Sequence, residues 1–438
     1  MSSLDQRKLH HRITAGVLLF AAVLLGCSSQ PEDPLASLLA SNKDSLFREV
    51  VDHPEKYRLQ IIYTQIDRDE DNHPSFRDYY FNVDSTLYFN PASTVKLPLA
   101  LLSLEKLNTM DVPGVDKFTP ILFDSAFSGQ TRKDYDSTSE NYLPSIAHFI
   151  KKAFLVSDND AYNRMYEFVG QGAINRELHA KGYHGVRITH RFVRMTPEEN
   201  RHTNPVRFMS PDGQLIYAQP AAYNEDPFDF GRDEKVGQAH YDWNDSLVRE
   251  PMDFSQRNRL PLKDLHQMLR AAMFPEAVPA HQRFNLTDDD YAFLYQYLSQ
   301  FPGETNYPRY DSAEYFDSYV KFFFRDSLHQ KMPEGVRVFN KVGWSYGFLI
   351  DASYVADFQN NVEFMLSATL YVNSDGIVND NRYDYETVGH PFLFRLGQLI
   401  YKYERNRKRR YAPDLSAYAM TYERRSADGL PTVRGVDN

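Results

Sequence analysis

The chain contains one cysteine, Cys27, in 438 residues, so the mature protein has no internal disulfide. Its stability must come from a packed core, which a chain of this length readily supplies because buried surface increases with size. The composition, 42% hydrophobic and 25% charged, is that of an ordinary globular protein. The apolar run at residues 13–25 is too short to span a membrane comfortably.

Basic residues are outnumbered, with 49 Lys and Arg against 59 Asp and Glu and a formal net charge of -10. This balance argues against a nucleic-acid partner, which requires cations that neutralise phosphates. The basic run at residues 405–410 is interpreted as a solvated helix end, with a binding patch as the alternative. Zinc signatures, glycine-rich phosphate loops and nucleotide fingerprints are missing, so no cofactor or metal is implied. Histidines such as His184, His190 and His202 lack ligand spacing and are expected to be surface or structural.

The N-terminus has the pattern of an export signal. Basic residues within positions 8–12 precede the apolar run, which ends in Leu24-Leu25-Gly26-Cys27. This ending resembles the lipobox of bacterial lipoproteins, which implies cleavage of a signal peptide (residues 1–26) and lipidation of Cys27. Residues 27–42 would then form a tether. Ser28 replaces the aspartate that resembles an inner-membrane retention signal, so the expected location is the cell envelope, anchored by lipid to the outer membrane.

Periodicity places strands near both ends of the chain and helices between them. We expect strands at residues 57–67, 79–89, 336–341 with 345–357, and 362–372, and helices at 93–107, 143–170 (broken at 156–159), 173–181, 262–273, 288–298 and 391–403. This order suggests a mixed sheet closed by the two termini, with a helical lobe inserted. Residues 43–409 would form the catalytic domain and residues 410–438 a polar, peripheral tail.

Ser93 and Lys96 form a Ser-x-x-Lys motif, in which hydroxyl and amine lie on one face of a helix. At a helix start the dipole favours an alkoxide and a neutral lysine alike. The spacing also occurs at Ser103/Lys106 and Ser318/Lys321. Ser93 differs because it follows a strand and Asn-Pro-Ala, and so opens its helix. Simple N-capping is the alternative role for Ser93.

Two further motifs follow in order, Ser157-Asp158-Asn159 and Lys341-Val342-Gly343. The first breaks a helical run, and its alternative interpretation is a capping turn. The second lies on a predicted strand, where an edge lysine beside a turn glycine is the alternative. A rival to the first, Ser139-Glu140-Asn141, lacks its flanking sequence.

The three motifs together resemble those of class A serine β-lactamases and penicillin-binding proteins. The likeness is strongest around Ser157, in residues 146–170, IAHFIKKAFLVSDNDAYNRMYEFVG, and continues to Gly182. It covers about residues 57–403. The resemblance implies an α/β (α+β), β-lactamase-like fold: a five-stranded antiparallel sheet flanked by helices, plus an inserted all-helical lobe.

The resemblance also assigns roles to residues. Ser93 would be the acylated nucleophile, Lys96 its base or proton relay, and Ser157 the donor to the leaving nitrogen. Asn159 would bind the substrate side-chain amide, and Lys341, on the strand that carries Gly343, would attract a substrate carboxylate. The backbone N–H groups of Ser93 and Trp344 would form the oxyanion hole.

The sequence departs from the family pattern in two places. The glutamate that activates the deacylating water usually follows an Arg and an aromatic residue, but Val193 stands there, and Glu198 and Glu199 are the nearest candidates. Val342 replaces a hydroxyl residue of the third motif, for which Ser345 is a conjectured substitute. Residues 206–258 lack periodicity and are predicted to be an insertion. They either cover the cleft and change the substrate class, or form a surface excursion or dimer contact.

The sequence is compatible with three functions. The first is a lipid-anchored serine hydrolase of the class A β-lactamase-like group, acting on a β-lactam or a related cell-wall amide. The second is a peptidoglycan D,D-carboxypeptidase or transpeptidase. The third is a non-turnover envelope sensor or binding lipoprotein.

Overall fold

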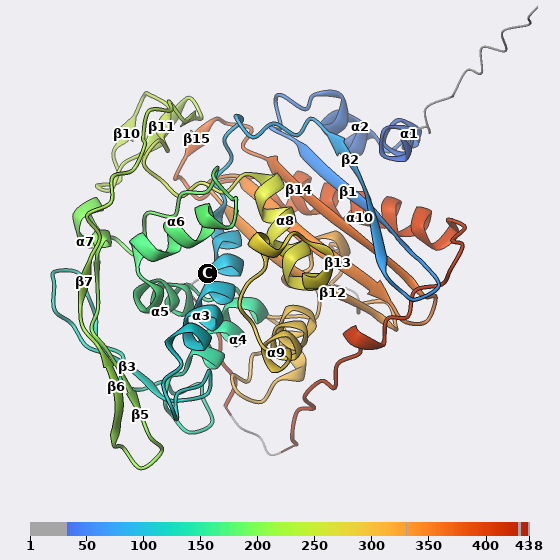
Figure 1. Ribbon diagram of the computed structural model, residues 1–438. Coiled ribbons are helices and arrows are strands. Elements are labelled where there is room, and N and C mark those ends of the chain that lie inside the picture. The colour runs from blue at the N-terminus through green and yellow to red at the C-terminus, as the bar shows by residue number, and fades with distance from the viewer. Residues whose placement is uncertain (1–32, 330, 428–430, 437–438) are drawn as a thin grey trace, which may run out of the picture. The chain divides into compact units, whose positions relative to one another are not determined.

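The computed structural model describes residues 33–329, 331–427 and 431–436. Its centre is one antiparallel sheet in the order β12-β13-β14-β1-β2 (Figure 1). The strands are β1 (Gln60–Arg68), β2 (Pro74–Phe81), β12 (Val336–Ser345), β13 (Phe348–Asp357) and β14 (Val362–Tyr371). The predicted five-stranded antiparallel sheet is confirmed. The mixed sheet suggested by periodicity alone is wrong, because the two chain ends pair antiparallel through β1 and β14.

Ten α-helices are described around this sheet. They are α1 (Pro34–Ser41), α2 (Ser45–Asp52), α3 (Lys96–Met110), α4 (Ile146–Leu155), α5 (Asn159–Val169), α6 (Gln171–Ala180), α7 (Pro197–Arg201), α8 (Leu262–Met273), α9 (Asp288–Ser299) and α10 (His390–Asn406). Among the described residues, no helix is long and apolar enough to cross a membrane.

Short 3-10 and π turns join these helices and strands. They are η1 (Ala92–Val95), η2 (Pro275–Ala277), η3 (Ala280–Gln282), η4 (Pro302–Glu304), η5 (Phe322–Phe324), the π-helical η6 (Tyr385–Gly389) and η7 (Ser416–Tyr418).

The sheet separates two hydrophobic cores, and β13 shows why. All ten of its residues are buried, because helices cover both faces. Ile350 and Ala352 point into the core that contains α8 and α9, while Leu349 and Val355 point into the core of α1, α2 and α10. Side chains that alternate between two buried faces give a strand with a near-continuous apolar sequence.

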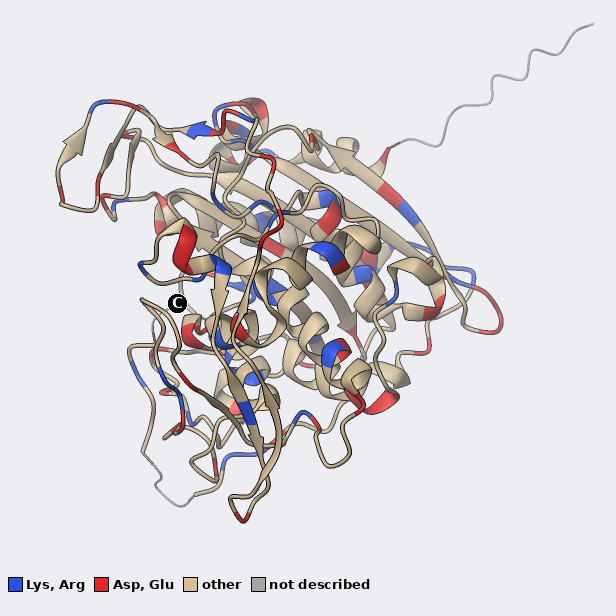
Figure 2. Cartoon of the chain, turned by 60° about the vertical axis from the view of Figure 1, so that its left-hand side comes forward, with Lys and Arg blue, Asp and Glu red and all other residues tan. Residues whose placement is uncertain are grey.

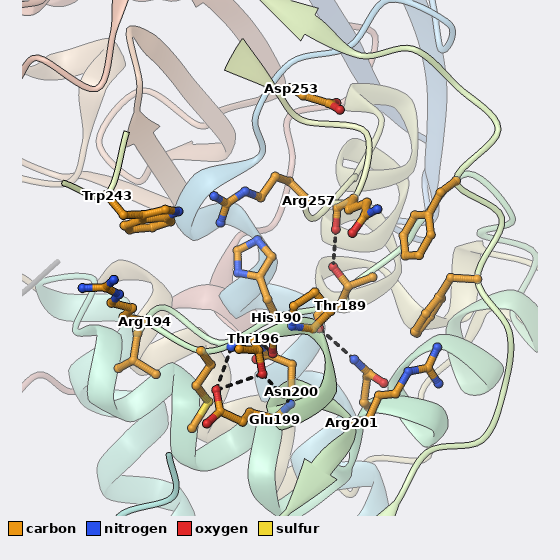
Figure 3. Close-up of a pocket in the computed structure, with 17 residues that line it drawn as sticks. Thr189, His190, Arg194, Thr196, Glu199, Asn200, Arg201, Trp243, Asp253 and Arg257 are labelled. Carbon is orange, nitrogen blue, oxygen red and sulfur yellow. Dashed lines mark hydrogen bonds between the residues drawn. The ribbon is translucent and has the colours of Figure 1, made fainter. Parts of the chain in front are cut away.

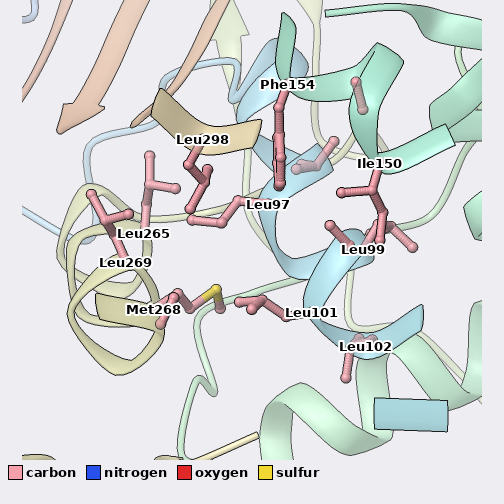
Figure 4. Close-up of a cluster of buried hydrophobic side chains, with 14 of the residues drawn as sticks. Leu97, Leu99, Leu101, Leu102, Ile150, Phe154, Leu265, Met268, Leu269 and Leu298 are labelled. Atoms are coloured by element: carbon pink, nitrogen blue, oxygen red, sulfur yellow. The ribbon is translucent and has the colours of Figure 1, made fainter. Parts of the chain in front are cut away.

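Helix α3 runs through the middle of the larger core (Figure 4). Its residues 96–104 are buried on every side, and its leucines contact Ile150 and Phe154 of α4, Leu298 of α9 and the leucines of α8. A helix that is apolar all round is stable only when it is enclosed in this way. The Ser-x-x-Lys motif therefore begins a rigid, enclosed helix.

The inserted region is not all-helical, which corrects that prediction. Besides helices, residues 121–253 contain the short strands β3 (Ile121–Phe123), β4 (His202–Thr203), β5 (Val206–Met209), β6 (Leu215–Gln219), β7 (Ala222–Tyr223), β8 (Lys235–Val236), β9 (Ala239–Tyr241), β10 (Leu247–Val248) and β11 (Met252–Asp253). Strand β9 also pairs with β15 (Ile377–Val378), so the insertion is joined to the segment after the central sheet.

Both ends of the folded body differ from the expected boundaries. Residues 34–41, placed in the predicted tether, form helix α1, whose Leu35 and Leu39 are buried against the sheet core. The tail is not peripheral, because Tyr418 packs in the other core and Glu423 pairs with Lys151. The predicted signal peptide and Cys27 lie outside the described residues.

Charged residues of both signs are interspersed over the chain in Figure 2. The basic run at residues 405–410 belongs to this pattern. Arg407 forms ion pairs with Asp67 and Glu404, and Arg409 with Glu404. These guanidinium groups hold the end of α10 against β1, so a structural role is supported over a binding patch.

Candidate active site

Ser93 lies in η1, a tight turn that leads directly into α3. Asn90 Oδ1 accepts a hydrogen bond from the Ala92 N–H at 3.1 Å, and Thr94 Oγ1 donates to the Pro91 carbonyl at 2.6 Å. Ala92 has φ of +44°, a left-handed conformation that is unfavourable for alanine. The Asn-Pro-Ala sequence thus forms a fixed turn that presents the Ser93 hydroxyl.

Lys96 is fully buried and contacts all three partners that its predicted role requires. Its Nζ lies 2.7 Å from Ser93 Oγ, 2.8 Å from Asn159 Oδ1 and 3.3 Å from Ser157 Oγ. It also donates to the Ser157 carbonyl. An amine at hydrogen-bonding distance from a hydroxyl can remove its proton when the amine is neutral. The structure therefore brings Ser93, Lys96, Ser157 and Asn159 together.

Ser157 occupies the turn between α4 and α5, with φ of +66°. Asp158, the next residue, caps α5 by accepting a hydrogen bond from the Ala161 N–H at 2.8 Å. The capping interpretation of this motif is confirmed for Asp158, and the catalytic role of Ser157 stays a prediction. Asp158 holds the turn, while the left-handed backbone at Ser157 turns its hydroxyl toward the two lysines.

Lys341 approaches Ser157 from the sheet. Its Nζ donates to Ser157 Oγ at 2.9 Å and to the Val342 carbonyl at 2.7 Å. Burial lowers the pKa of Lys341 well below its ordinary value, and the positive charge of nearby Lys96 lowers it further. One hydroxyl therefore links two amines, which is an arrangement suited to proton relay.

Strand β12 is an edge strand, and its register determines which way the Trp344 N–H points. Tyr346 and Gly347 have φ of +53° and +86°, as in the type I′ turn of a two-residue hairpin. The turn makes Ser345 and Phe348 the closing hydrogen-bonded pair. Pairs alternate along an antiparallel ladder. Trp344 is therefore at a non-hydrogen-bonded position, with its N–H directed away from β13 toward the open edge.

Gly343 lets this edge approach Ser93. A Cβ atom at Gly343 would lie 2.7 Å from the Pro91 carbonyl oxygen and 3.0 Å from the Ser93 nitrogen. No side chain fits there without displacing η1. The close contact places the edge of β12 that carries the Trp344 N–H beside the Ser93 turn.

A cavity of about 310 Å³ opens over Ser93. It is lined by Asn90, Ala92, Ser93, Asn159, His190, Arg191, Phe192, Val193, Arg194, Trp243, Phe254, Arg257, Trp344, Ser345 and Tyr346. The predicted residues Asn159, Trp344 and Ser345 are therefore at the cleft. The insertion contributes Trp243, Phe254 and Arg257, so it covers the cleft, as one of the two interpretations expected.

Glu198 and Glu199 do not line this cavity. Glu199 caps α7: one of its carboxylate oxygens accepts from Thr196 and the other from Ser128. Glu198 is exposed, and its carboxylate lies 3.4 Å from the His202 ring. The loop is rebuilt, but not in a way that directs either carboxylate to Ser93.

His190 lines this cavity and the larger one beside it. Its Nδ1 is 2.8 Å from the Arg191 carbonyl, which fixes the proton on that nitrogen. Burial lowers the pKa of His190 to about 4, so the ring is neutral at neutral pH. Sequence reasoning missed this role, together with Arg194, Trp243 and Arg257, because no motif or periodicity marks these positions.

The competing copies of the motifs have structural roles. Ser103 Oγ donates to the Leu99 carbonyl within α3, at 2.7 Å. Lys321 Nζ donates to the Leu298 carbonyl and to Asn340 Oδ1, each at 2.6 Å. Ser139 belongs to a turn and donates to the Asp136 carbonyl. None of the three lines the Ser93 cavity. Among the described residues, no cluster of three His, Cys, Asp or Glu side chains is arranged to hold a metal.

A family model matches part of the chain. Residues 48–217 match the model of the beta-lactamase enzyme family. This part of the chain is similar to that family. The matched residues include Ser93, Lys96, Ser157 and Asn159, and the match ends before Lys341.

Several solved structures are also similar to the chain. A beta-lactamase from Desulfarculus baarsii has 16% identity, covers 83% of this chain and 96% of its own, and has a TM-score of 0.41. An ancestral class A beta-lactamase has 15% identity, coverage of 84% and 99%, and a TM-score of 0.42. PBP-A has 14% identity, coverage of 85% and 98%, and a TM-score of 0.46. No curated protein matches the chain.

Proposed function

We propose that the protein is a serine hydrolase of the class A β-lactamase-like group that forms an acyl-enzyme at Ser93. The observation that carries this proposal is the continuous chain of polar contacts from Ser93 through Lys96 and Ser157 to Lys341. A purely structural role would not require two lysines to be buried at one serine, because removing ammonium groups from water is unfavourable.

The first chemical step is nucleophilic attack on an amide carbonyl. Ser93 Oγ bonds to the carbonyl carbon as its proton passes to Lys96, which accepts it in the fraction of molecules in which its amine is deprotonated, and the carbonyl oxygen becomes an oxyanion. The N–H groups of Ser93 and Trp344 would stabilise that oxyanion, each contributing about 3–4 kcal/mol as in other acyl-transfer enzymes. Collapse of the intermediate breaks the C–N bond. The Ser157 hydroxyl protonates the leaving nitrogen and regains a proton from Lys96 or Lys341.

The substrate class that fits is a β-lactam or a related cell-wall amide that carries a carboxylate. Lys341 provides the positive charge for that carboxylate, Asn159 a side-chain amide for the acyl group, and Ser345 a hydroxyl at the cleft. A fluorescent penicillin should label the protein, and Ser93→Ala should abolish labelling. Ser103→Ala is the matched control and should label normally. A folded wild-type protein that takes no label contradicts the proposal.

A peptidoglycan D,D-carboxypeptidase or transpeptidase is the second candidate. It is favoured by one observation: of the described residues that line the Ser93 cleft, none is Asp or Glu. Without a carboxylate base the acyl-enzyme should persist, or pass to an amine acceptor. This candidate predicts slow release of penicilloyl product together with release of D-alanine from a stem peptide. Rapid turnover of nitrocefin would contradict it and support the β-lactamase.

Lipid anchoring at Cys27 in the bacterial envelope remains part of the proposal. It is supported by the Leu-Leu-Gly-Cys sequence. Metabolic labelling with a radioactive fatty acid should mark the wild type and not Cys27→Ser. Equal labelling of the two proteins would exclude this modification.

A further inference from the structure

A second cavity, of about 750 Å³, adjoins the Ser93 cleft. The two share five lining residues, which form the passage between them: His190, Val193, Arg194, Trp243 and Arg257. Figure 3 shows Trp243, Arg194 and Arg257 around this passage, with the His190 ring between them. A substrate bound at Ser93 could therefore extend into the second cavity, which we call the arginine chamber.

Two guanidinium groups in the passage are available to a ligand. Arg194 and Arg257 lie with their guanidinium carbons 5.9 Å and 5.5 Å from the centre of the Trp243 ring. Within the described part of the chain, neither forms an ion pair with a carboxylate. Arg201, which also lines the chamber, differs because it donates to the carbonyls of Asn224 and Asp226.

The acidic residues of the chamber do not neutralise this pair. Glu199 is occupied by its bonds to Thr196 and Ser128. Asp253 accepts from the Ser255 N–H at 2.7 Å. Both carboxylates thus have donors of their own. The passage keeps two positive charges beside an aromatic surface that is 58% exposed.

We propose that the arginine chamber binds a second carboxylate, carried by the acyl side chain of the substrate, beyond the amide at Asn159. Arg194 and Arg257 pair with this carboxylate, and Trp243 packs against the adjoining part of the side chain. Guanidinium groups suit carboxylates because their planar N–H donors match the two oxygens. This inference rests on the proposed acyl-transfer function, in which Lys341 holds the first carboxylate.

Benzylpenicillin and carbenicillin test the chamber, because they differ by one carboxylate on the acyl side chain. The quantity measured is the ratio of their second-order rate constants for acylation of Ser93, carbenicillin over benzylpenicillin. In Arg194→Gln/Arg257→Gln this ratio should fall about tenfold, as expected for loss of charge-assisted hydrogen bonds. Arg194→Lys/Arg257→Lys should restore part of it.

The matched control is Arg249→Gln, which removes an exposed arginine of the same insertion outside the lining of either cavity. It should leave the ratio unchanged. The proposal that the arginine chamber binds a carboxylate is overturned if the ratio of acylation rate constants is unchanged in the double Gln variant, or if it falls equally in the control. Absence of acylation by both penicillins would instead count against the proposed function.

A measurement of binding affinity tests the arginine chamber even if neither penicillin acylates Ser93. Calorimetry on the full-length Ser93→Ala protein compares N-acetyl-D-glutamate with N-acetyl-D-glutamine, which has one carboxylate fewer. The dianion should bind at least about fivefold more tightly, and the difference should vanish in the double Gln background. Equal affinity for the two compounds, or binding of neither at millimolar concentration, overturns the proposal independently of catalysis.

Discussion

Ser157 combines an unfavourable backbone with a central position in the site. Its φ of +66° is a conformation that residues other than Gly, Asn and Asp seldom adopt. Asp158 and Asn159, with helical and capping contacts on either side, hold the turn in place. Strain of this kind persists only where the surroundings determine it, and here it directs a hydroxyl between two lysines.

Two substitutions of Ser157 distinguish the strain in its backbone from the proposed proton transfer by its hydroxyl. Ser157→Ala and Ser157→Gly should each slow acylation by about 100-fold, because both lose the hydroxyl that we propose transfers the proton. The Gly variant should be more stable than the Ala variant by about 1 kcal/mol, since glycine adopts a positive φ freely. Acylation rates and urea unfolding measure the two effects. Equal acylation by wild type and Ala variant would exclude Ser157 from the relay.

The pKa of Lys341 predicts the alkaline side of the pH profile. Because burial and Lys96 lower this pKa, Lys341 loses its charge at a lower pH than an ordinary lysine. The acylation rate constant for a penicillin should therefore fall as the pH rises through that pKa. A penicillin whose ring carboxylate is esterified should lack the part of the decrease that comes from Lys341.

A substitution of Asp351 tests whether the pKa of Lys341 determines the alkaline decrease in the acylation rate. Its negative charge raises the pKa of Lys341 and opposes the lowering effects. Asp351→Asn should therefore shift the alkaline decrease to lower pH. Asp71→Asn, an exposed aspartate in the loop between β1 and β2, is the control and should leave the profile in place. A shift to higher pH would contradict the assignment.

At the scale of elements, the site is the contact between η1 at the start of α3, the α4–α5 turn and the edge of β12. Residues 96–104 of α3 are buried and its leucines pack in the larger core, so its first turn has a fixed position (Figure 4). Gly343 then determines how closely β12 approaches that turn.

Gly343→Ala should displace the two elements. The added Cβ would contact backbone atoms of Pro91 and Ser93 rather than a flexible side chain, so Ser93 must move. We expect acylation to slow at least about tenfold, since displacements near 1 Å cost this much or more. Gly213→Ala, with a positive φ and no neighbour within 4 Å, is the control. It should lower stability without affecting the acylation rate.

At the scale of the molecule, buried ionisable groups continue from the site into the space between the sheet and α9. Lys321 contacts Asn340, which donates to Asp351 at 2.8 Å. Burial lowers the pKa of Lys321 to about 7 and raises that of Asp351 to about 6. These groups make the stability of the whole protein depend on pH.

The sign of this dependence can be tested with Lys321→Met. The unfolded chain binds the Lys321 proton up to about pH 10.4, while the folded chain releases it near pH 7. The free energy of unfolding of the wild type should therefore rise, relative to the variant, by about 3 kcal/mol between pH 7 and 10. Urea unfolding at several pH values measures this difference. Lys263→Met, at an exposed position, should show no such trend.

Much of the fold could be predicted because its elements are locally marked. Helix α8 has the predicted bounds, and α4 and α5 break at Ser157 as expected. The predicted strand at residues 79–89 is wrong in its position, because residues 74–81 pair with β1 and residues 82–89 do not. Both segments are rich in aromatic residues, and only pairing with β1 chooses between them. The sequence does not predict the helix at residues 34–41, because only packing against the sheet core shows that its two leucines are buried.

The sequence alone determined which residues form the proposed acyl-transfer site, because a nucleophile, its base and its relay must be specific residue types at spacings that local backbone geometry can present. Ser93, Lys96, Ser157 and Lys341 meet as those motifs predict. Only the tertiary structure decided what surrounds them. The insertion folds over the cleft, Glu198 and Glu199 are outside its lining, and Arg194 and Arg257 enter it. These placements depend on contacts between residues distant in sequence, which no local pattern encodes.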